Sequence, residues 1–189
     1  AKQIEAEGEE EYVGRGISYC AICDGSFHEK QNVVVIGGGN SAIEEALYLA
    51  KICKKVTIIT RGHHFRADPV LMEKVMRANN VDLVTHHVIT KFTGKDLLEQ
   101  VTAKDRDSDN EIVLNVRGAF IYVGFTPSST LLENFDILDE DKYIIVDRNC
   151  ETKVTGLYAA GDCIQKNIRQ IATAVADGIT CASAIVRKI

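Results

Sequence analysis

The sequence predicts an α/β protein. Its first part reads as a three-layer domain, and its last part as a strand and a helix of a second domain. Three observations favour this fold. A β-branched run is broken by three glycines and is followed by apolar residues at helical spacing. Three extended runs joined by polar turns come next, and a separate strand-and-helix pattern follows them.

The first strand–helix–strand unit is the clearest part of the chain. Residues 33–36 read Val-Val-Val-Ile, which is typical of a strand buried on both faces of a parallel sheet. Apolar residues then recur at helical spacing, so a helix is expected from about Ser41 to Cys53. Residues 55–60 (KVTIIT) predict a second strand. Together these pieces form a βαβ unit of the usual length, the core of a Rossmann-like nucleotide-binding domain.

A second helix and a third parallel strand continue the pattern. Asp68 followed by Pro69 is typical of an N-cap with proline at the first helical position, and this helix is expected to run to about Asn79. Residues 81–84 predict the third strand. The extended runs after it predict an antiparallel β-meander. These runs are residues 86–93, 98–105 and 111–116.

The last part of the chain changes character. Residues 119–123 predict one more buried strand, ended by the sequence GFTP. Short strands are expected at residues 143–146 and 157–160. The second of these is followed by a Gly161-Asp162 turn and by a long helix through residues 172–185. We interpret this last strand and helix as a remnant of a second domain.

Composition and charge exclude several classes of protein. The 189 residues include 22 basic and 27 acidic side chains, which gives a net charge of −5. An acidic chain without a basic block is a poor nucleic-acid binder. No apolar run approaches the ~18 residues of a membrane span, and no secretory signal opens the chain. We therefore expect a cytoplasmic protein that binds neither nucleic acid nor membrane.

Two of the six cysteines, Cys20 and Cys23, form a C-x-x-C motif. The size of the chain and the spacing of the other four argue against a disulfide-stapled secreted domain. A zinc ribbon would need a second cysteine pair, or histidines at ligand spacing. Thiol–disulfide chemistry is the favoured interpretation, with half of a metal site or chance spacing as alternatives. Asp24, next to the pair, is a candidate proton donor and acceptor.

No metal site is expected from the remaining residues. His86 and His87 are neighbours in an expected strand, so their side chains point to opposite faces and cannot share an ion. The other cysteines are expected to be ordinary buried thiols. They are Cys53, Cys150, Cys163 and Cys181.

A glycine-rich turn provides the second motif. Gly37-x-Gly39-x-x-Ala42 follows a strand and opens a helix, the context in which this motif binds a dinucleotide. Gly37 permits the tight turn, Gly39 lets a pyrophosphate approach the backbone, and Ala42 is small enough for helix–strand packing. The helix start offers free N–H groups to phosphates. A turn without a ligand is the alternative. The candidate cofactor-binding residues here are Gly37, Gly38, Gly39, Asn40, Ser41 and Ala42.

The residues after the second strand indicate which dinucleotide binds. NAD sites place Asp or Glu at that strand end, where it bonds the ribose 2′-OH. Here the strand ends in TRGHHFR, with no acid before Asp68. Arg61 and Arg66 could instead clamp a 2′-phosphate. NADPH is therefore the expected cofactor, and an ordinary solvated surface is the alternative for both arginines.

Several motifs, in order, resemble those of the small bacterial type of thioredoxin reductase. They are GRGISYCAICDG, VVVIGGGNSAIEEALYLAKICKKVTIITRGHHFRA, VGFTP and TGLYAAGDCIQKNIRQIATAVADG, and they span nearly the whole chain. Members of that family are homodimeric flavoproteins with an FAD domain and an inserted NADPH domain that carries the C-x-x-C. The resemblance implies that electrons pass from NADPH through FAD to the cysteine pair, then to thioredoxin or a related dithiol protein.

The resemblance also implies roles for individual residues. Cys23 resembles the cysteine that faces the flavin, Cys20 the one that attacks the thioredoxin disulfide, and Asp24 the acid–base group. Asp162 resembles the residue that bonds the FAD ribityl chain, and the VGFTP motif contributes Gly124. A helix start beneath the flavin ring would stabilise negative charge on the reduced flavin. The remaining cofactor-binding residues implied are Gly161, Arg169, Gln170, Ile171 and Ala172.

Two departures from the family pattern change these expectations. Thr60 and Gly62 replace a histidine and an arginine of the family's NADPH signature, while Arg61 and Arg66 remain, so the preference for NADPH is expected to be weakened. The glycine-rich FAD-binding unit that should precede the chain is missing. We therefore interpret the chain as a fragment that lacks the first FAD segment and is inactive by itself.

The expected domains follow from the resemblance. Residues 1–16 are expected to be a hinge and the end of an FAD-domain segment. Residues 17–148 are expected to form the NADPH-binding domain with the redox pair, and residues 149–189 the C-terminal part of the FAD domain. Two alternatives stay open. One is a related flavoprotein disulfide oxidoreductase with another donor or acceptor, and the other is a non-catalytic nucleotide-binding fragment.

Overall fold

The computed structural model describes residues 2–188. The chain divides into two compact units, one ending at Gly124 and the other beginning at Phe125. Each unit is described by itself. The expected division between residues 148 and 149 concerns cofactor-binding domains rather than compact units, and it stays a prediction.

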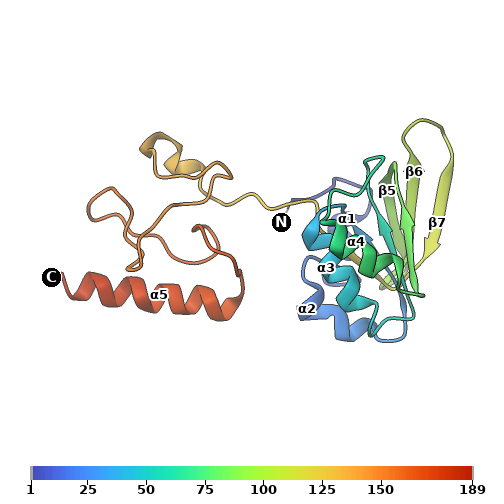
Figure 1. Cartoon of the computed structure of the whole chain (residues 1–189), viewed down its shortest axis with the longest axis horizontal. Helices are drawn as coiled ribbons and strands as arrows, with labels where there is room; N and C mark the ends of the chain where they lie inside the picture. The colour runs from blue at the N-terminus through green and yellow to red at the C-terminus, as the bar shows by residue number, and fades with distance from the viewer. Residues whose placement is uncertain (1, 189) are drawn as a thin grey trace. The chain divides into compact units, whose positions relative to one another are not determined.

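A parallel sheet forms the middle layer of the first unit (Figure 1). Within the described residues it has the strand order β1-β8-β2-β3-β4, and every neighbouring pair is parallel. The three strands predicted at residues 33–36, 55–60 and 81–84 are confirmed. The strands are β1 (Ile17–Ser18), β2 (Asn32–Ile36), β3 (Lys55–Ile59), β4 (Val81–Val84) and β8 (Gly118–Ile121).

Helices α3 (Asn40–Leu49) and α4 (Pro69–Met76) cover one face of this sheet. Val33 and Val35 of β2 point into their layer, where they are fully buried. Both helices end earlier than expected, because α3 passes into turns after Leu49 and α4 stops at Met76. The N-cap prediction is confirmed: the carboxylate of Asp68 accepts a hydrogen bond from the Val70 N–H at 2.8 Å.

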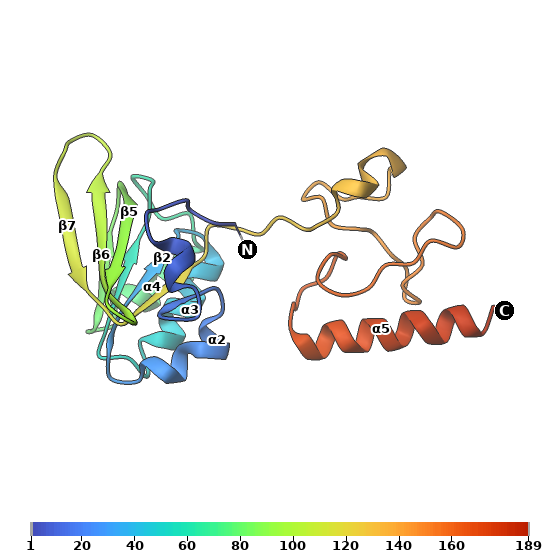
Figure 2. The same cartoon turned by 180° about the vertical axis from the view of Figure 1, so that it is seen from behind.

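The predicted β-meander covers the other face of the sheet (Figure 1 and Figure 2). Its strands pair antiparallel in the order β5-β6-β7. Val34 and Ile36, the alternate residues of β2, pack on this side with Phe92 and Leu98. The first unit therefore has the three layers that the sequence predicts. The meander strands are β5 (His87–Gly94), β6 (Leu98–Asp105) and β7 (Glu111–Asn115).

Three short helical elements precede β2, and the sequence pattern had not indicated them. The first, α1 (Glu9–Tyr12), contains Glu9, whose buried carboxylate accepts backbone N–H bonds from Ile4 and Glu5. These bonds fix the backbone of residues 4 and 5 to α1. The other two elements are α2 (Ala21–Asp24) and η1 (Gly25–His28).

The second unit contains η2 (Thr130–Phe135) and the predicted long helix, α5 (Ile171–Val186). The strands predicted at residues 143–146 and 157–160 are wrong. Ile144 and Tyr158 each make only isolated β-bridges. A strand needs a neighbour with which to form a continuous ladder, and single bridges do not provide one. The core of this unit is small and is centred on Ile137, Ile144 and Ile164.

Helix α5 leaves its apolar side chains uncovered. None of its described residues is buried. Ile171, Val175 and Ile179, spaced four residues apart, are 85%, 55% and 64% exposed. Four-residue spacing places them on one face of the helix. Across residues 2–188, no helix combines the length and the apolar character that crossing a bilayer requires.

Candidate functional site

The strand order marks the carboxyl edge of the parallel sheet as the candidate ligand site. From β2 the chain proceeds through β3 to β4 on one side, and it returns on the other side of β2 as β8. The order therefore reverses between β2 and β8. Ligands of open α/β sheets bind outside the carboxyl ends of the strands at such a reversal. The glycine-rich turn follows β2 directly and so lies at this point.

Each glycine of the turn meets a different neighbour. An added Cβ at Gly37, which has φ +148°, would lie only 2.4 Å from the Tyr122 carbonyl oxygen. An added Cβ at Gly38 would lie 2.5 Å from Thr60 Oγ1. At Gly39 nothing lies within 4 Å of that position. Gly37 and Gly38 are thus required by the packing of the protein itself, whereas Gly39 faces open space that a ligand can fill. Ala42 is 1% exposed and packs in the helix–sheet core.

The start of α3 lies beside this open space. Gly39 is its N-cap residue and provides no side-chain cap, so the first N–H groups of the helix have no partner from that residue. Asn40 and Ser41 are both exposed. The Asn40 side-chain oxygen accepts a hydrogen bond from the Asp68 N–H at 2.8 Å, which ties the helix start to the loop after β3. The arrangement can hold a phosphate at the helix N-terminus.

Arg61 and Arg66 lie at the same edge. The Arg66 N–H donates to the Gly38 carbonyl at 2.7 Å, so the loop after β3 folds back onto the glycine turn. The Arg61 carbonyl accepts from Arg106 Nη1 at 3.2 Å. Both arginines are exposed, and neither guanidinium forms an ion pair with a described residue. Both are therefore available to an anionic group beside the turn.

Gly124 lies at the end of the segment that follows β8. The Tyr122 N–H donates to the Ile36 carbonyl at 2.7 Å, which brings this segment alongside the end of β2. Gly124 has φ +108°, and its carbonyl accepts from the Lys2 N–H at 2.9 Å. The structure thus brings the predicted residues Gly37 to Ala42, Arg61, Arg66 and Gly124 to one edge of one sheet.

Cys20 and Cys23 form a disulfide, with their Cα atoms 5.3 Å apart. Cys20 is the N-cap residue of α2, and its sulfur accepts a hydrogen bond from the Cys23 N–H at 3.2 Å. Cys20 is half-buried and Cys23 is exposed. The predicted pairing of these cysteines is therefore present, in a segment that is partly exposed to solvent.

Ser18 organises the residues around the disulfide, and the sequence reasoning missed it. Its hydroxyl donates to Asp24 Oδ2 at 2.6 Å and accepts from the Cys20 N–H at 3.1 Å. Asp24 is thereby held in place beside the pair. The spacing Ser-x-Cys is that of a serine turn in which a hydroxyl bonds the backbone two residues on, so the signal was present in the sequence.

Two aromatic groups complete this neighbourhood. The Tyr122 hydroxyl accepts a hydrogen bond from the buried Ala21 N–H at 2.7 Å. Burial raises the pKa of the Tyr122 phenol well above its ordinary value. Burial also lowers the pKa of His28, a shift that Asp24 opposes. Tyr122 joins the disulfide helix to the segment after β8. Ala21 and Tyr122 are 101 positions apart in the sequence, so sequence reasoning could not find this contact.

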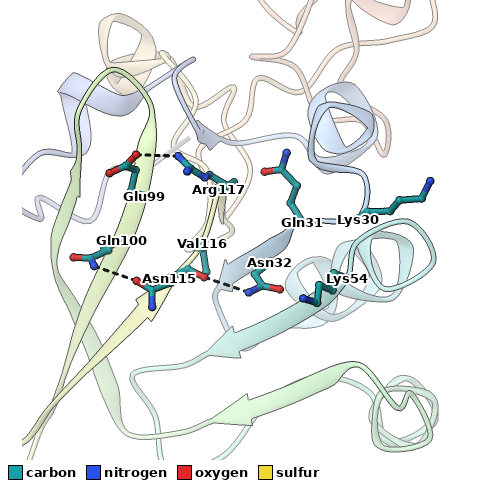
Figure 3. Close-up of a pocket in the computed structure, with 9 residues that line it drawn as sticks. All are labelled: Lys30, Gln31, Asn32, Lys54, Glu99, Gln100, Asn115, Val116 and Arg117. Atoms are coloured by element: carbon teal, nitrogen blue, oxygen red, sulfur yellow. Dashed lines mark hydrogen bonds and ion pairs between the residues drawn. The ribbon is translucent and has the colours of Figure 1, made fainter.

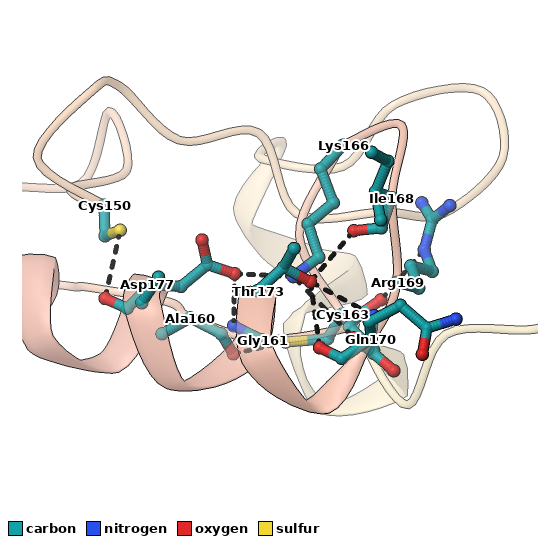
Figure 4. Close-up of polar contacts among 12 residues, drawn as sticks. Cys150, Ala160, Gly161, Cys163, Lys166, Ile168, Arg169, Gln170, Thr173 and Asp177 are labelled. Carbon is teal, nitrogen blue, oxygen red and sulfur yellow. Dashed lines mark hydrogen bonds and ion pairs between the residues drawn. The ribbon is translucent and has the colours of Figure 1, made fainter. Parts of the chain in front are cut away.

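In the second unit, polar contacts hold the turn at Gly161 against α5 (Figure 4). The Gly161 N–H donates to Asp177 Oδ2 at 3.2 Å. Lys166 Nζ donates to the same oxygen at 2.6 Å, and it lies 3.7 Å from Asp162 Oδ1. Lys166 and Asp177 are largely buried, whereas the Asp162 side chain is exposed. The turn is therefore fixed while its carboxylate stays available.

The predicted residues at the start of α5 lie beside this turn. Arg169 Nε donates to the Asp162 carbonyl at 3.3 Å, and its guanidinium lies 3.9 Å from the centre of the Tyr143 ring. Gln170 caps the helix in a reciprocal arrangement with Thr173. Ile171 and Ala172 are exposed at the first turn. The structure therefore brings together the predicted residues of this unit.

The other cysteines differ in burial. Cys53 and Cys150 are buried, and Cys163 and Cys181 are half-buried. Burial raises the pKa of the Cys53 thiol to about 11. Burial also raises the pKa of the Cys150 thiol, whose sulfur lies 3.6 Å from the Asp177 carbonyl oxygen. Both are therefore protonated at neutral pH and poor nucleophiles, as expected for structural thiols.

A pocket with a volume of about 540 Å³ lies elsewhere in the first unit (Figure 3). Its lining includes Asn32 at the start of β2, Lys54 just before β3, and Arg117 just before β8. The pocket thus lies at the amino ends of the parallel strands. It is distinct from the carboxyl edge of the sheet, where the predicted residues meet.

A glycine-rich βαβ turn of the nucleotide-binding type and a disulfide in one compact unit define a class of protein, the dinucleotide-dependent disulfide oxidoreductases. Residues 1–178 match the family described as pyridine nucleotide-disulphide oxidoreductase, and the chain belongs to this family.

Within the family, the chain is similar to thioredoxin reductases. It is 40% identical over 187 residues to the thioredoxin reductase of Bacillus subtilis strain 168, covering 97% of this chain and 58% of that protein. It is 38% identical over 178 residues to the one from Listeria innocua, covering 94% and 56%. The crystal structure of thioredoxin reductase from Streptococcus pyogenes MGAS5005 superposes with a TM-score of 0.93 at 36% identity, covering 98% of this chain and 61% of that one. The chain spans less than two thirds of the length of these relatives.

Proposed function

We propose that the chain acts in a thioredoxin–disulfide reductase that takes electrons from NADPH. One observation carries the proposal. The Cys20–Cys23 disulfide and the open glycine-rich turn lie in the same compact unit. Tyr122 lies between them, because its hydroxyl bonds the Ala21 N–H next to Cys20 and its carbonyl oxygen lies against Gly37. A donor site and an electron-accepting disulfide are thus built on one scaffold. The match to thioredoxin reductases supports this function over others in the family.

The residues at the carboxyl edge of the sheet fit NADPH. The open space at Gly39 and the uncapped start of α3 suit a pyrophosphate. Arg61 and Arg66 would hold the 2′-phosphate, because a guanidinium donates two parallel hydrogen bonds to phosphate oxygens. An NAD site would require an Asp or Glu here to bond the ribose 2′-OH. No acidic residue lies between Thr60 and Asp68.

The residues of the second unit fit part of FAD. The exposed Asp162 carboxylate would accept from ribityl hydroxyls, and the first turn of α5 with Gln170, Ile171 and Ala172 would approach the ring. Gly161 and Arg169 support this site, because each is bonded to the turn or the helix that forms it. When bound, NADPH would supply a hydride, and FAD would pass its two electrons to the cysteine pair.

The cysteine pair then acts by thiol–disulfide exchange. After reduction, the Cys20 thiolate attacks one sulfur of the acceptor disulfide, forming a mixed disulfide and releasing the other sulfur as a thiolate that takes up a proton. The Cys23 thiolate next attacks Cys20 Sγ, which restores the internal disulfide and releases the second acceptor thiol. The hydrogen bond from the Cys23 N–H to Cys20 Sγ favours Cys20 as the thiolate. Asp24, held by Ser18, would transfer the protons.

The proposed acceptor is thioredoxin or a related dithiol protein, and the proposed working form is a homodimer in the cytoplasm. Ile22, within the C-x-x-C motif, and Phe27, in η1 just after it, are 63% and 78% exposed. Exposed apolar side chains in the segment that carries the cysteine pair suit contact with a protein acceptor better than with a small charged one.

Serine substitution of each cysteine tests the function. In the reductase that carries this chain, Cys20→Ser or Cys23→Ser should abolish NADPH-dependent reduction of thioredoxin, measured by a thiol reagent. Reduction of the flavin by NADPH, followed by its absorbance, should continue. Cys181→Ser serves as the matched control because its half-buried thiol lies on α5, in the other unit. Normal thioredoxin turnover in Cys20→Ser or in Cys23→Ser would contradict the proposal.

A further inference from the structure

Three side chains from separate segments converge near the edge of the first unit. His63 follows β3, His86 lies between β4 and β5, and Asp107 lies in the turn between β6 and β7. Each offers one metal-binding atom, and these atoms all lie within 4.8 Å of one another. The cluster is distinct from the disulfide, and no step of the proposed function uses it.

The backbone holds the three segments in place. The His86 N–H donates to the Gly62 carbonyl at 2.9 Å, and the Arg106 N–H donates to the His86 carbonyl at 3.0 Å. The Asp105 carboxylate accepts N–H bonds from Asp107 and Ser108, both at 2.9 Å. Gly62, next to His63, and Arg106, next to Asp107, are thus both bonded to the His86 backbone. The cluster is therefore fixed by the fold rather than formed by chance contact of long surface side chains.

The His86 ring lacks the partners that a buried imidazole normally has. Its side chain is only 13% exposed, and both ring nitrogens are buried without a hydrogen bond to any described residue. Nε2 lies 2.9 Å from Asp107 Oδ2, but the two atoms are not aligned as a hydrogen bond. Buried polar atoms nearly always have a partner, and one left without is costly. A bound cation would supply a partner for one of these two nitrogens.

We propose that His63, His86 and Asp107 form a binding site for a divalent transition-metal ion of the zinc type. Two imidazoles and one carboxylate are ligands that Zn²⁺ prefers. Bond lengths of about 2.0–2.1 Å at a tetrahedral angle separate two ligand atoms by about 3.3 Å. The 2.9 Å between His86 Nε2 and Asp107 Oδ2 is close to that separation. The fourth position stays open to water.

Metal binding requires one local movement. The rings of His63 and His86 are stacked, with centres 3.8 Å apart and planes 12° from parallel. A metal ion binds in the plane of an imidazole, so one ring must turn out of the stack. His63 is exposed and can turn, whereas His86 is enclosed. The nearby Arg106 guanidinium donates to the Arg61 carbonyl. The Asp107 carboxylate is therefore available as the negatively charged ligand of the ion.

Titration of the full chain with Co²⁺ and Zn²⁺ tests this site. Co²⁺ reports its ligands by visible absorption, and thiolate ligands add a near-ultraviolet charge-transfer band. We expect one equivalent of Co²⁺ to bind without that band and to be displaced by Zn²⁺. His63→Ala and Asp107→Asn should weaken binding by at least about 10- to 100-fold, the loss caused by removing even an outer-shell partner. Both residues are exposed, so both variants should fold.

His64→Ala is the matched control, because His64 is an exposed neighbour of His63 outside the cluster. Its Co²⁺ affinity should equal that of the unmodified chain. The proposal is overturned if binding is not saturable, if His63→Ala and Asp107→Asn bind as well as the control, or if the thiolate band appears. Since none of these readouts involves reductase activity, they are independent of the proposed function.

Discussion

Arg61 and Arg66 are the residues on which the choice of nucleotide depends. They differ in how they are held, because the Arg66 backbone bonds Gly38 directly and the Arg61 carbonyl is bonded by Arg106. Both guanidinium groups are exposed. Gly62 and Thr60 add no charge at this edge. Discrimination between NADPH and NADH therefore depends on very few basic groups.

We predict that Arg61→Ala weakens NADPH binding by about 1.5–3 kcal/mol, the loss typical of a hydrogen bond to a charged group. NADH binding should change little, because NADH lacks the 2′-phosphate. Titration of both nucleotides, followed by fluorescence or calorimetry, measures this difference.

Arg77→Ala is the control for Arg61→Ala. Arg77 follows α4 and pairs with Glu73 on an exposed surface. Its loss should leave both affinities unchanged. An equal loss of NADPH and NADH affinity in Arg61→Ala would show that Arg61 does not contact the 2′-phosphate.

At the scale of elements, the β2–α3 turn separates the demands of packing from those of binding. Gly37 is confined by the Tyr122 carbonyl and has a positive φ, while Gly39 has φ −97° and open space around it. The same substitution at the two positions should therefore have different effects.

We predict that Gly37→Ala lowers the free energy of unfolding by about 2–4 kcal/mol, because the Cβ meets backbone that cannot move aside and the φ disfavours alanine. Gly39→Ala should cost less than about 1 kcal/mol of stability but weaken NADPH binding by about tenfold or more, or ~1.4 kcal/mol. Urea unfolding and nucleotide titration provide the two measurements. Wild-type NADPH affinity in Gly39→Ala would contradict a pyrophosphate at this turn.

At the scale of the whole molecule, the two units are unequally equipped for nucleotides. The first has a complete βαβ unit with a glycine-rich turn. In the second, residues 125–188 contain the Gly161-Asp162 turn and α5 but no β-strand ladder. A pyrophosphate needs its own glycine-rich helix start.

We predict that the polypeptide of residues 1–189 binds NADPH, lacks stoichiometric FAD and is colourless after purification. The visible absorption spectrum and the released-flavin content measure this, with intact mass to confirm the polypeptide. NADPH titration on the same sample shows that the first unit is folded. A yellow preparation with one flavin per chain would contradict the prediction.

The sequence by itself determined the features that depend on near neighbours in the chain. The β-branched run and glycine turn of residues 33–39, the Asp68 N-cap and the alternation of the meander each express a local preference of the backbone. The Cys20–Cys23 pair lies within reach because only two residues stand between the two cysteines. For the same reason, the glycine-rich turn after β2 could be predicted from the sequence, whereas the roles of the other candidate site residues stay predictions.

Only the tertiary structure decided the features that join distant segments. Tyr122 bonds Ala21 across 101 residues, and His63, His86 and Asp107 come from three separate loops. The strands expected at residues 143–146 and 157–160 did not form, because pairing depends on a neighbour rather than on the apolar pattern of a single segment. Local sequence sets what a segment prefers, and packing alone sets which segments meet.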